Sequence, residues 1–261
     1  MTEPRDGLSR RAVLAAALGA MTAACTKNEV PPPAQARARA TTPAPSPAPG
    51  LPGHAARAVS GPSREVAFGS RDRREVALTF HGAGDPALAV GVLSALAAAR
   101  AHVTVLAVGT WLDQHSELAR RIVGAGHELG NHTWTHPVLA NLGEPAAKVQ
   151  IERCRDLLLR LTGTPGAHFR QSGGAHSTPL IRRLAGTAGY PVCLSYDVDS
   201  LDYTDPGPTA VRRKVAAEVR PGSIVSLHLG HAGTLRALPG VLADLDAKGL
   251  RPVTATTLLR P

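Results

Sequence analysis

The fold and chemistry of this chain are indicated most clearly by residues 126–137, which read GHELGNHTWTHP. This stretch sets two imidazoles, His132 and His136, four residues apart and directly ahead of a proline. On a helical turn this spacing puts both side chains on one face. Imidazole is a common neutral ligand for zinc and related divalent ions, so both histidines are candidate metal ligands. His127, in contrast, is expected to be a packed structural histidine.

The chain from about Arg73 onward alternates short apolar runs with Ala- and Leu-rich helical stretches. The pattern predicts strands at 75–80, 102–108, 192–196, 223–229 and 251–254, and helices at 88–99, 112–125, 145–161, 178–188 and 209–219. Repetition of this unit predicts an α/β fold, and the count suits a barrel of parallel strands. Such barrels carry their sites on loops at the carboxyl ends of the strands.

Five segments with chemical side chains fall at those expected strand ends. They are Thr79–Pro86 (TFHGAGDP), the His132–His136 pair, Phe169–Gly174 (FRQSGG), Tyr196–Tyr203 (YDVDSLDY) and Ser226–His228 (SLH). Together they resemble the motifs of the polysaccharide deacetylases, the NodB-homology or carbohydrate esterase family 4 enzymes. The resemblance covers residues 73–261 and implies that family's distorted (β/α)7 barrel. It also implies a divalent metal, zinc or another such as cobalt, and an N-acetylated polysaccharide such as peptidoglycan or a chitin-like glycan.

The first motif departs from the family. There it ends in two aspartates, of which the first is the general base and the second binds the metal with two histidines. Here His81 stands at the base position and Gly82 at the carboxylate position. Either the loop folds back so that Asp85 supplies the missing ligand and His81 acts as base or further ligand, or only binding remains. Asp85 before Pro86 is also a typical helix cap.

The third and fifth motifs assign further roles by resemblance. Arg170 matches the arginine that orients the catalytic aspartate, so Asp85 or the substrate is its expected partner. Gly173 stands where a backbone N–H stabilises the oxyanion, a role that needs no side chain. His228 matches the histidine that protonates the leaving amine, and Asp199 is the carboxylate expected to hold it.

Three residues are candidate sugar contacts: Asp202 and Tyr203 of the fourth motif, which walls the sugar pocket in the family, and Trp134. Aromatic residues make up only 3% of the chain, which speaks mildly against a long sugar groove. The leading hypothesis is an exported, metal-dependent hydrolase that removes acetyl groups from N-acetylated sugars of a polysaccharide. The alternatives are a non-catalytic carbohydrate-binding protein on the same barrel and a hydrolase of a small amide.

Residues 1–25 read as an export signal, and residues 26–72 as a Pro- and Ala-rich linker. Paired arginines in Ser9–Leu14 resemble a twin-arginine signal, although an ordinary secretory signal is the alternative. Cys25 follows a sequence resembling a lipidation box. The protein is therefore expected outside the cell, released or anchored by lipid to the outer face of the cytoplasmic membrane.

The formal net charge of +9 has two readings. It reflects an arginine-rich coding bias, or it draws the protein to anionic polymers of the cell envelope. No nucleic-acid partner is expected, because the sequence has no basic helix with interleaved aromatics. Cys154 and Cys193 are expected to be buried free thiols.

Overall fold

The structure is a computed structural model that describes residues 61–261. The expected export signal, Cys25 and most of the linker lie outside the described residues. Strand β1, Arg64–Val66, pairs in parallel with β5, Val192–Leu194. The fold therefore includes residues ahead of Arg73, where the sequence predicts the domain to begin. The sequence did not predict β1, because a three-residue strand with one buried side chain has no readable periodicity.

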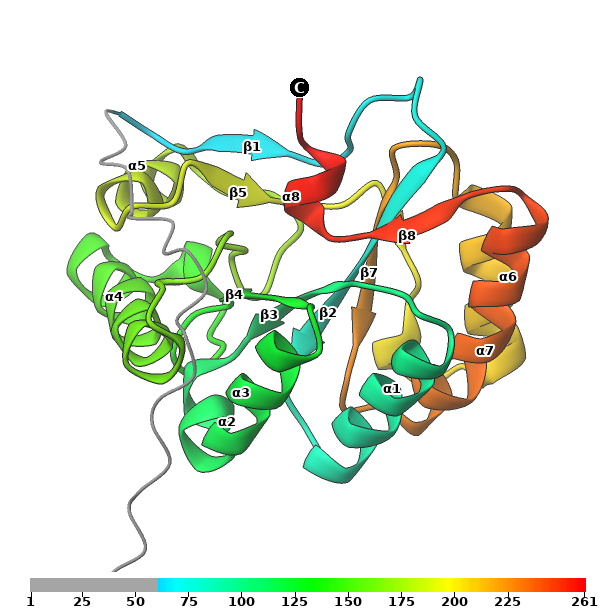
Figure 1. The fold of residues 1–261 in the computed structure, drawn as a ribbon. Coiled ribbons are helices and arrows are strands. Elements are labelled where there is room, and N and C mark those ends of the chain that lie inside the picture. The colour runs from blue at the N-terminus through cyan, green and yellow to red at the C-terminus, as the bar shows by residue number, and fades with distance from the viewer. Residues whose placement is uncertain (1–60) are drawn as a thin grey trace, which may run out of the picture. The chain divides into compact units, whose positions relative to one another are not determined.

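A curved parallel sheet forms the centre of the fold (Figure 1). Its strand order is β4-β3-β2-β7-β6, and β8 pairs with β2 as well. The strands are β2 (Glu75–Gly82), β3 (Thr104–Ala107), β4 (Glu128–Asn131), β6 (Val198–Asp199), β7 (Ile224–His228) and β8 (Arg251–Val253). Nearly every residue of β2 is buried, as expected for a central parallel strand covered on both faces.

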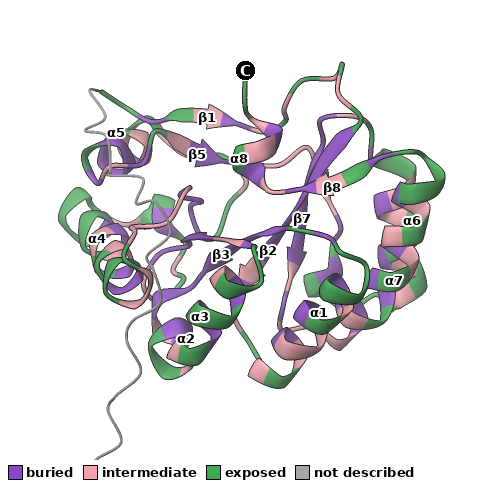
Figure 2. Cartoon of the chain, in the orientation of Figure 1, coloured by how far each residue is buried: buried purple, intermediate pink, exposed green. Residues whose placement is uncertain are grey.

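The helices are α1 (Pro86–Ala98), α2 (Gly109–Gln114), α3 (Ser116–Gly124), α4 (Glu144–Thr162), α5 (Pro179–Thr187), α6 (Pro208–Glu218), α7 (Ala232–Ala247) and α8 (Ala255–Leu258), with short 3₁₀ turns η1 (Leu139–Asn141) and η2 (Asp202–Thr204). Helices α1–α7 lie outside the wall of strands, with their apolar faces inward and their exposed faces outward, and α8 packs on the inner face of the central sheet (Figure 2). Within the described part of the chain, none of these helices has the length and apolarity needed to cross a bilayer.

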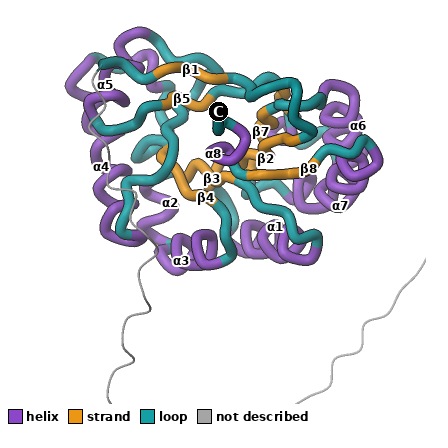
Figure 3. The backbone as a smooth tube through the Cα atoms, turned by 45° about the horizontal axis from the view of Figure 1, so that its top comes forward, coloured by secondary structure: helices purple, strands orange, loops and turns teal. Residues whose placement is uncertain are grey.

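One residue continues the sheet beyond β4. Phe169 forms single parallel bridges to Asn131 on one side and to Cys193 on the other, so the pairing runs from β4 through Phe169 to β5 and β1. The strands form a curved wall with α1–α7 outside it, whereas α8 lies within the curve (Figure 3). The prediction of an α/β fold is confirmed. Between β5 and β6 the described wall is continued by the connecting chain, residues 195–197, and not by a ladder.

The predicted strands and helices are present, one helix being divided, and five further strands and helices were not predicted: β1, β4, β6, α7 and α8. The expected helix 112–125 is broken at His115 into α2 and α3. Strand β4 was not predicted, since it is short and begins with a charged Glu128. Helix α7 was not predicted because Pro239 lies inside it. Both remaining cysteines are free and buried, as the sequence predicts.

A buried hydrogen-bond group fixes the start of the loop that follows β4. The Asn131 amide nitrogen donates to the Ile151 carbonyl at 2.8 Å and to the Tyr190 hydroxyl at 3.0 Å. That hydroxyl in turn donates to the Pro165 carbonyl at 2.6 Å. The group therefore ties β4 to α4 and to the chain entering β5.

Replacing Tyr190 with phenylalanine should lower the free energy of unfolding by about 1–3 kcal/mol, because a buried donor and a buried acceptor lose their partner. Chemical denaturation measures this change. Tyr203→Phe is the matched control, since Tyr203 is 48% exposed and should change stability by less than about 0.5 kcal/mol. Equal stabilities of the two variants would contradict the role given to the Tyr190 hydroxyl.

Candidate functional site

His132 and His136 lie on an irregular loop after β4, not on a helical turn. Thr133 and His136 have φ angles of 68° and 58°, in the left-handed region that residues other than glycine rarely occupy. This turn brings the two rings to a centroid separation of 4.7 Å. The spacing therefore predicts the pairing correctly, but its helical explanation is wrong.

The loop is held by polar side chains on both flanks. The Asn131 side-chain oxygen accepts from the Thr133 N–H at 2.9 Å. The Gln150 side-chain oxygen, on α4, accepts from the N–H groups of Trp134 and Thr135 at 3.0 and 2.8 Å. Backbone strain of this kind persists only where the surroundings determine the conformation, and it concentrates at functional sites.

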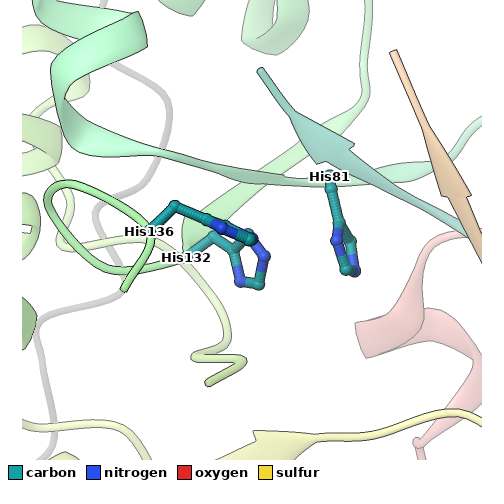
Figure 4. Close-up of side chains that lie close together, drawn as sticks. All are labelled: His81, His132 and His136. Atoms are coloured by element: carbon teal, nitrogen blue, oxygen red, sulfur yellow. The ribbon is translucent and has the colours of Figure 1, made fainter. Parts of the chain in front are cut away.

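A third imidazole, His81, joins this pair from the end of β2. One ligand-type nitrogen from each of His81, His132 and His136 lies within 4.8 Å of the others. Figure 4 shows the three rings close together, one from β2 and two from the loop after β4. A set of three imidazoles is a known ligand set of catalytic zinc sites.

The tautomer of His132 suits a ligand role. Its Nδ1 lies 3.0 Å from the Arg170 carbonyl oxygen and therefore donates to it, which leaves the lone pair on Nε2. Nε2 is buried without a hydrogen-bond partner among the described residues. Burial, and then the neighbouring His136, lower the pKa of His132 well below its usual value, so the ring is neutral as a metal requires. These properties fit a divalent metal.

Arg170 contacts His81, and not Asp85 as the sequence had suggested. Arg170 is buried, and its Nη1 lies 3.1 Å from His81 Nε2. A guanidinium only donates, so Nε2 accepts and the neutral His81 ring carries its proton on Nδ1. Burial, and then His132, lower the pKa of His81 well below its usual value. Burial also lowers the pKa of Arg170, to about 10.

The catalytic and ligand roles considered for Asp85 are wrong in this structure. Its side chain is exposed and caps α1 by accepting from the Ala87 N–H at 2.8 Å. It is not part of the group formed by the three imidazoles. Pro86 begins the helix immediately after it, so the local capping preference prevails over a loop that folds back.

His228 is held by Asp202, whereas the sequence had assigned this role to Asp199. His228 Nδ1 donates to Asp202 Oδ1 at 2.7 Å, and its backbone N–H donates to Oδ2 at 2.8 Å. Asp202 is fully buried and also accepts from Thr234. Burial alone would raise the pKa of Asp202, but these hydrogen bonds lower it. Asp199 instead accepts from the Leu201 N–H, because a left-handed Leu201 turns Asp202 inward.

A cavity of about 320 Å³ lies among these groups. It is lined by His81, His136, Gln171, Gly173, Gly174, Tyr196, Tyr203, Ser226 and His228, and no carboxylate is among them. Gly173 and Tyr203 line it as the sequence predicts.

Two predicted sugar contacts lie elsewhere. Trp134 packs on the core with the Arg153 guanidinium 4.2 Å from its ring centroid, and Asp202 lies beneath His228. Sequence reasoning missed Gln171 and Tyr196 as lining residues. Their positions within the third and fourth motifs were the available signal.

Two further histidines lie outside the cavity. His127 is buried, and its Nδ1 accepts from the Val103 N–H at 3.3 Å, which confirms a structural role. His231 pairs with the exposed Asp205 at 3.0 Å, beside His228 at a ring separation of 5.7 Å.

A profile described as Polysaccharide deacetylase matches residues 69–193. A chitooligosaccharide deacetylase of Sinorhizobium fredii is 34% identical over 186 residues, which cover 71% of this chain and 82% of that protein. A peptidoglycan-N-acetylglucosamine deacetylase of Bacillus cereus is 30% identical over 189 residues, which cover 71% and 88%.

Solved structures show the same fold. A peptidoglycan N-acetylglucosamine deacetylase bound to an N-oxidanyl-benzamide is 26% identical with a TM-score of 0.70, covering 75% of this chain and 92% of that one. A carbohydrate esterase family 4 pseudoenzyme from Bacillus anthracis is 23% identical with a TM-score of 0.71, covering 76% and 69%. At that identity the second likeness concerns the fold alone.

Replacing Asp85 with alanine should lower the free energy of unfolding by about 0.5–2 kcal/mol, the usual effect of removing an N-cap. Metal binding should not change, because Asp85 lies outside the imidazole group. Thermal unfolding and elemental analysis measure the two effects. Loss of metal from a folded Asp85→Ala protein would restore the ligand role.

Replacing Asp202 with asparagine should lower the free energy of unfolding by about 1–3 kcal/mol, because buried donors lose a charged acceptor. The folded-state pKa of Asp202 lies below its ordinary value of 3.8. Its stabilisation is therefore present above 3.8 and is lost as pH falls through the folded-state pKa, so wild type and variant should converge in acid.

The matched control for Asp202 is Asp199→Asn, measured by the same denaturation series. Asp199 accepts one backbone N–H, so this variant should change stability by less than about 0.5 kcal/mol. A larger loss at Asp199 than at Asp202 would return the positioning role to Asp199.

Proposed function

Because this chain belongs to the polysaccharide deacetylase family, we propose that it is an exported, metal-dependent hydrolase that removes N-acetyl groups from the amino sugars of a cell-wall or related polysaccharide. The observation that carries the proposal is the convergence of His81, His132 and His136 beside the Asp202–His228 pair. The names of the relatives point to chitooligosaccharides and peptidoglycan as substrates. Export is proposed from residues 1–25.

The three imidazoles would hold the metal, with His132 and His136 as the primary ligands. His81 is the weaker third ligand, because the Arg170 contact occupies its Nε2 and places a proton on Nδ1. Either the Arg170 contact at Nε2 must break or the proton on Nδ1 must leave before His81 can offer a lone pair to the metal. When bound, a divalent ion such as zinc supplies a Lewis acid for the amide carbonyl and lowers the pKa of water.

His228 is the proposed general base as well as the general acid. Among the described residues no carboxylate lines the cavity, and His81 Nε2 is held by Arg170. His228 donates from Nδ1 to Asp202, so Nε2 has the lone pair that can take a proton from the attacking water. The same nitrogen then gives this proton to the leaving amide nitrogen, which departs as the amine. Asp202 orients the ring and stabilises the imidazolium.

Gly173 and two tyrosines are proposed to place the substrate. Gly173 lines the cavity with φ of 71°, and a Cβ there would lie 2.7 Å from the Val138 Cα. A side chain at this position would clash with Val138, so glycine lets the backbone keep this conformation, in which its N–H would serve the developing oxyanion. Tyr196 and Tyr203 offer ring surface to the sugar.

A second candidate is a glycan-binding protein without catalysis. It is favoured by the cavity lining, which lacks the carboxylate base and the carboxylate ligand of the family's first motif. In this reading Tyr196 and Tyr203 contact a glycan, and the imidazoles perform no chemistry.

The purified full-length chain should contain about one zinc or similar ion after loading under metal-replete conditions. His132→Ala should lose it, because Nε2 of His132 is the best-prepared ligand. His81→Ala should keep a reduced amount. His231→Ala is the matched control and should bind metal like the wild type. Elemental analysis measures all four proteins.

Acetate release from chitooligosaccharides and from peptidoglycan then separates the two candidates. Release that depends on His132 and His228 supports the hydrolase. Metal binding together with glycan binding but no release favours the second candidate, and absence of metal from the wild type overturns the metal-dependent proposal.

A further inference from the structure

The amino ends of β2, β7 and β8 carry a concentration of basic side chains, which we call the basic end. Its members are Arg71, Arg73, Arg74, Arg220, Lys248, Arg251 and Arg260. Strand register places them together: Glu75 of β2 lies beside Arg251 of β8, and Arg71 Nη1 donates to the Pro221 carbonyl just ahead of β7. Figure 1 shows the start of β8 and helix α8 at the end of the sheet that these residues occupy.

The basic end carries more positive than negative charge. Residues 61–261 contain 22 Lys and Arg against 17 Asp and Glu, a surplus of five. The seven members of the basic end have five carboxylates nearby, which leaves a surplus of two. Those carboxylates are Asp72, Glu75, Asp197, Asp246 and Asp244, the last of which is also paired with Arg212.

Backbone carbonyls hold two of the arginines in place. Arg73 donates to the carbonyls of Leu258 at 2.6 Å and of Arg260 at 2.8 Å. Arg74 donates to the carbonyls of Gly249, at 3.1 Å, and of Lys248. A carbonyl carries no net charge, so it orients a guanidinium without neutralising it; Arg73 Nε additionally lies 3.7 Å from Glu75 Oε2, whereas Arg74 has no such ion pair among the described residues. Side chains fixed in this way lose little conformational entropy when an anion binds them.

Glu75 is shared by several arginines and cannot neutralise them all. It is buried, and it accepts from Arg251 and from Arg260, the latter at 2.8 Å. Although burial alone would raise the pKa of Glu75, hydrogen bonds from Arg260 and Arg251 lower it, so the group is a carboxylate. Arg251 and Arg260 remain 68% and 43% exposed, and their remaining N–H groups are available to a ligand.

From these observations we propose that the basic end binds an extended polymer that carries repeated phosphate groups. Guanidinium groups match phosphate oxygens in two-point hydrogen bonds. The cations come from four separate segments along one end of the sheet, so the ligand must present several anionic groups in a row and not a single one.

A polymer fits this surface better than a lipid bilayer. The exposed aromatic side chain next to the basic end, Phe68, is 52% exposed, but the Arg71 guanidinium lies 4.4 Å from its ring centroid. A ring covered in this way is not free to enter the apolar layer of a membrane.

Binding at the basic end leaves the cavity accessible. The cavity lies at the carboxyl ends of β2 and β7, where His81 and His228 pair in register. β2 has eight residues, so the two ends are separated by about 25 Å at roughly 3.3 Å per residue. This exceeds the Debye length of about 8 Å at physiological ionic strength, so the basic end has little electrostatic effect on the cavity. The polymer can thus hold the protein while the cavity engages another ligand.

The test is calorimetric titration of the full-length chain with long-chain inorganic polyphosphate at several salt concentrations. The wild type should bind, with an affinity that falls steeply as salt rises. The double variant Arg74→Glu and Lys248→Glu should bind at least about tenfold more weakly at low salt, with a shallower salt dependence.

The matched control is Arg120→Glu with Arg236→Glu, which makes the same change in net charge on the exposed faces of α3 and α7. It should bind within about threefold of the wild type. If the first double variant does not fold by circular dichroism, Lys248→Glu alone replaces it, since the Lys248 side chain makes no hydrogen bond among the described residues.

Three results would overturn the proposal: no binding by the wild type, equal weakening in both double variants, or tighter binding to phosphatidylglycerol vesicles than to polyphosphate per phosphate. Either of the first two results would mean that the basic end is a solvated surface without a specific ligand. The third result would mean that it binds a membrane surface. None of these measurements uses metal or acetate release, so their outcome is independent of the proposed hydrolase.

Discussion

The buried guanidinium of Arg170 is the interaction on which the site depends. Its nitrogen atoms donate to the Leu194 and Ser195 carbonyls, to the Thr79 hydroxyl and to His81, and its own carbonyl accepts from His132. One residue thereby positions the end of β2, the chain after β5 and the first ligand histidine relative to one another. Because all its donors are directed inward, Arg170 acts through its neighbours and does not line the cavity.

The loss of carboxylates changes the chemistry around this arginine. In the family the residue at the His81 position is an aspartate, which balances the guanidinium charge. Here the contacting atom is a neutral imidazole nitrogen, and burial lowers the pKa of both partners. In the proposed mechanism the base function therefore belongs to His228, which has the buried carboxylate of Asp202 behind it.

Sequence reasoning predicted those features that depend on short-range pattern. The α/β alternation, most helices and the proximity of His132 and His136 follow from periodicity and motif spacing. The cap formed by Asp85 was among the alternatives because its signal is local.

The sequence could not show which way side chains point once distant strands meet. Arg170 contacts His81 across 89 positions, and Asp202 contacts His228 across 26. Asp202, and not Asp199, holds His228 because Leu201 has a left-handed backbone conformation. A leucine in the sequence gives no sign of that conformation, since residues other than glycine rarely adopt it.

The single-residue bridge at Phe169 has a consequence for motion. Between β4 and β5 the wall is joined by backbone hydrogen bonds of the short segment 167–170, which ends at Arg170. A local opening of this seam would carry the arginine away from His81 and its carbonyl away from His132 in the same step. Amide hydrogen exchange at this seam and disorder of the imidazole group should therefore be coupled, with both arising from one sub-global opening below the global unfolding free energy.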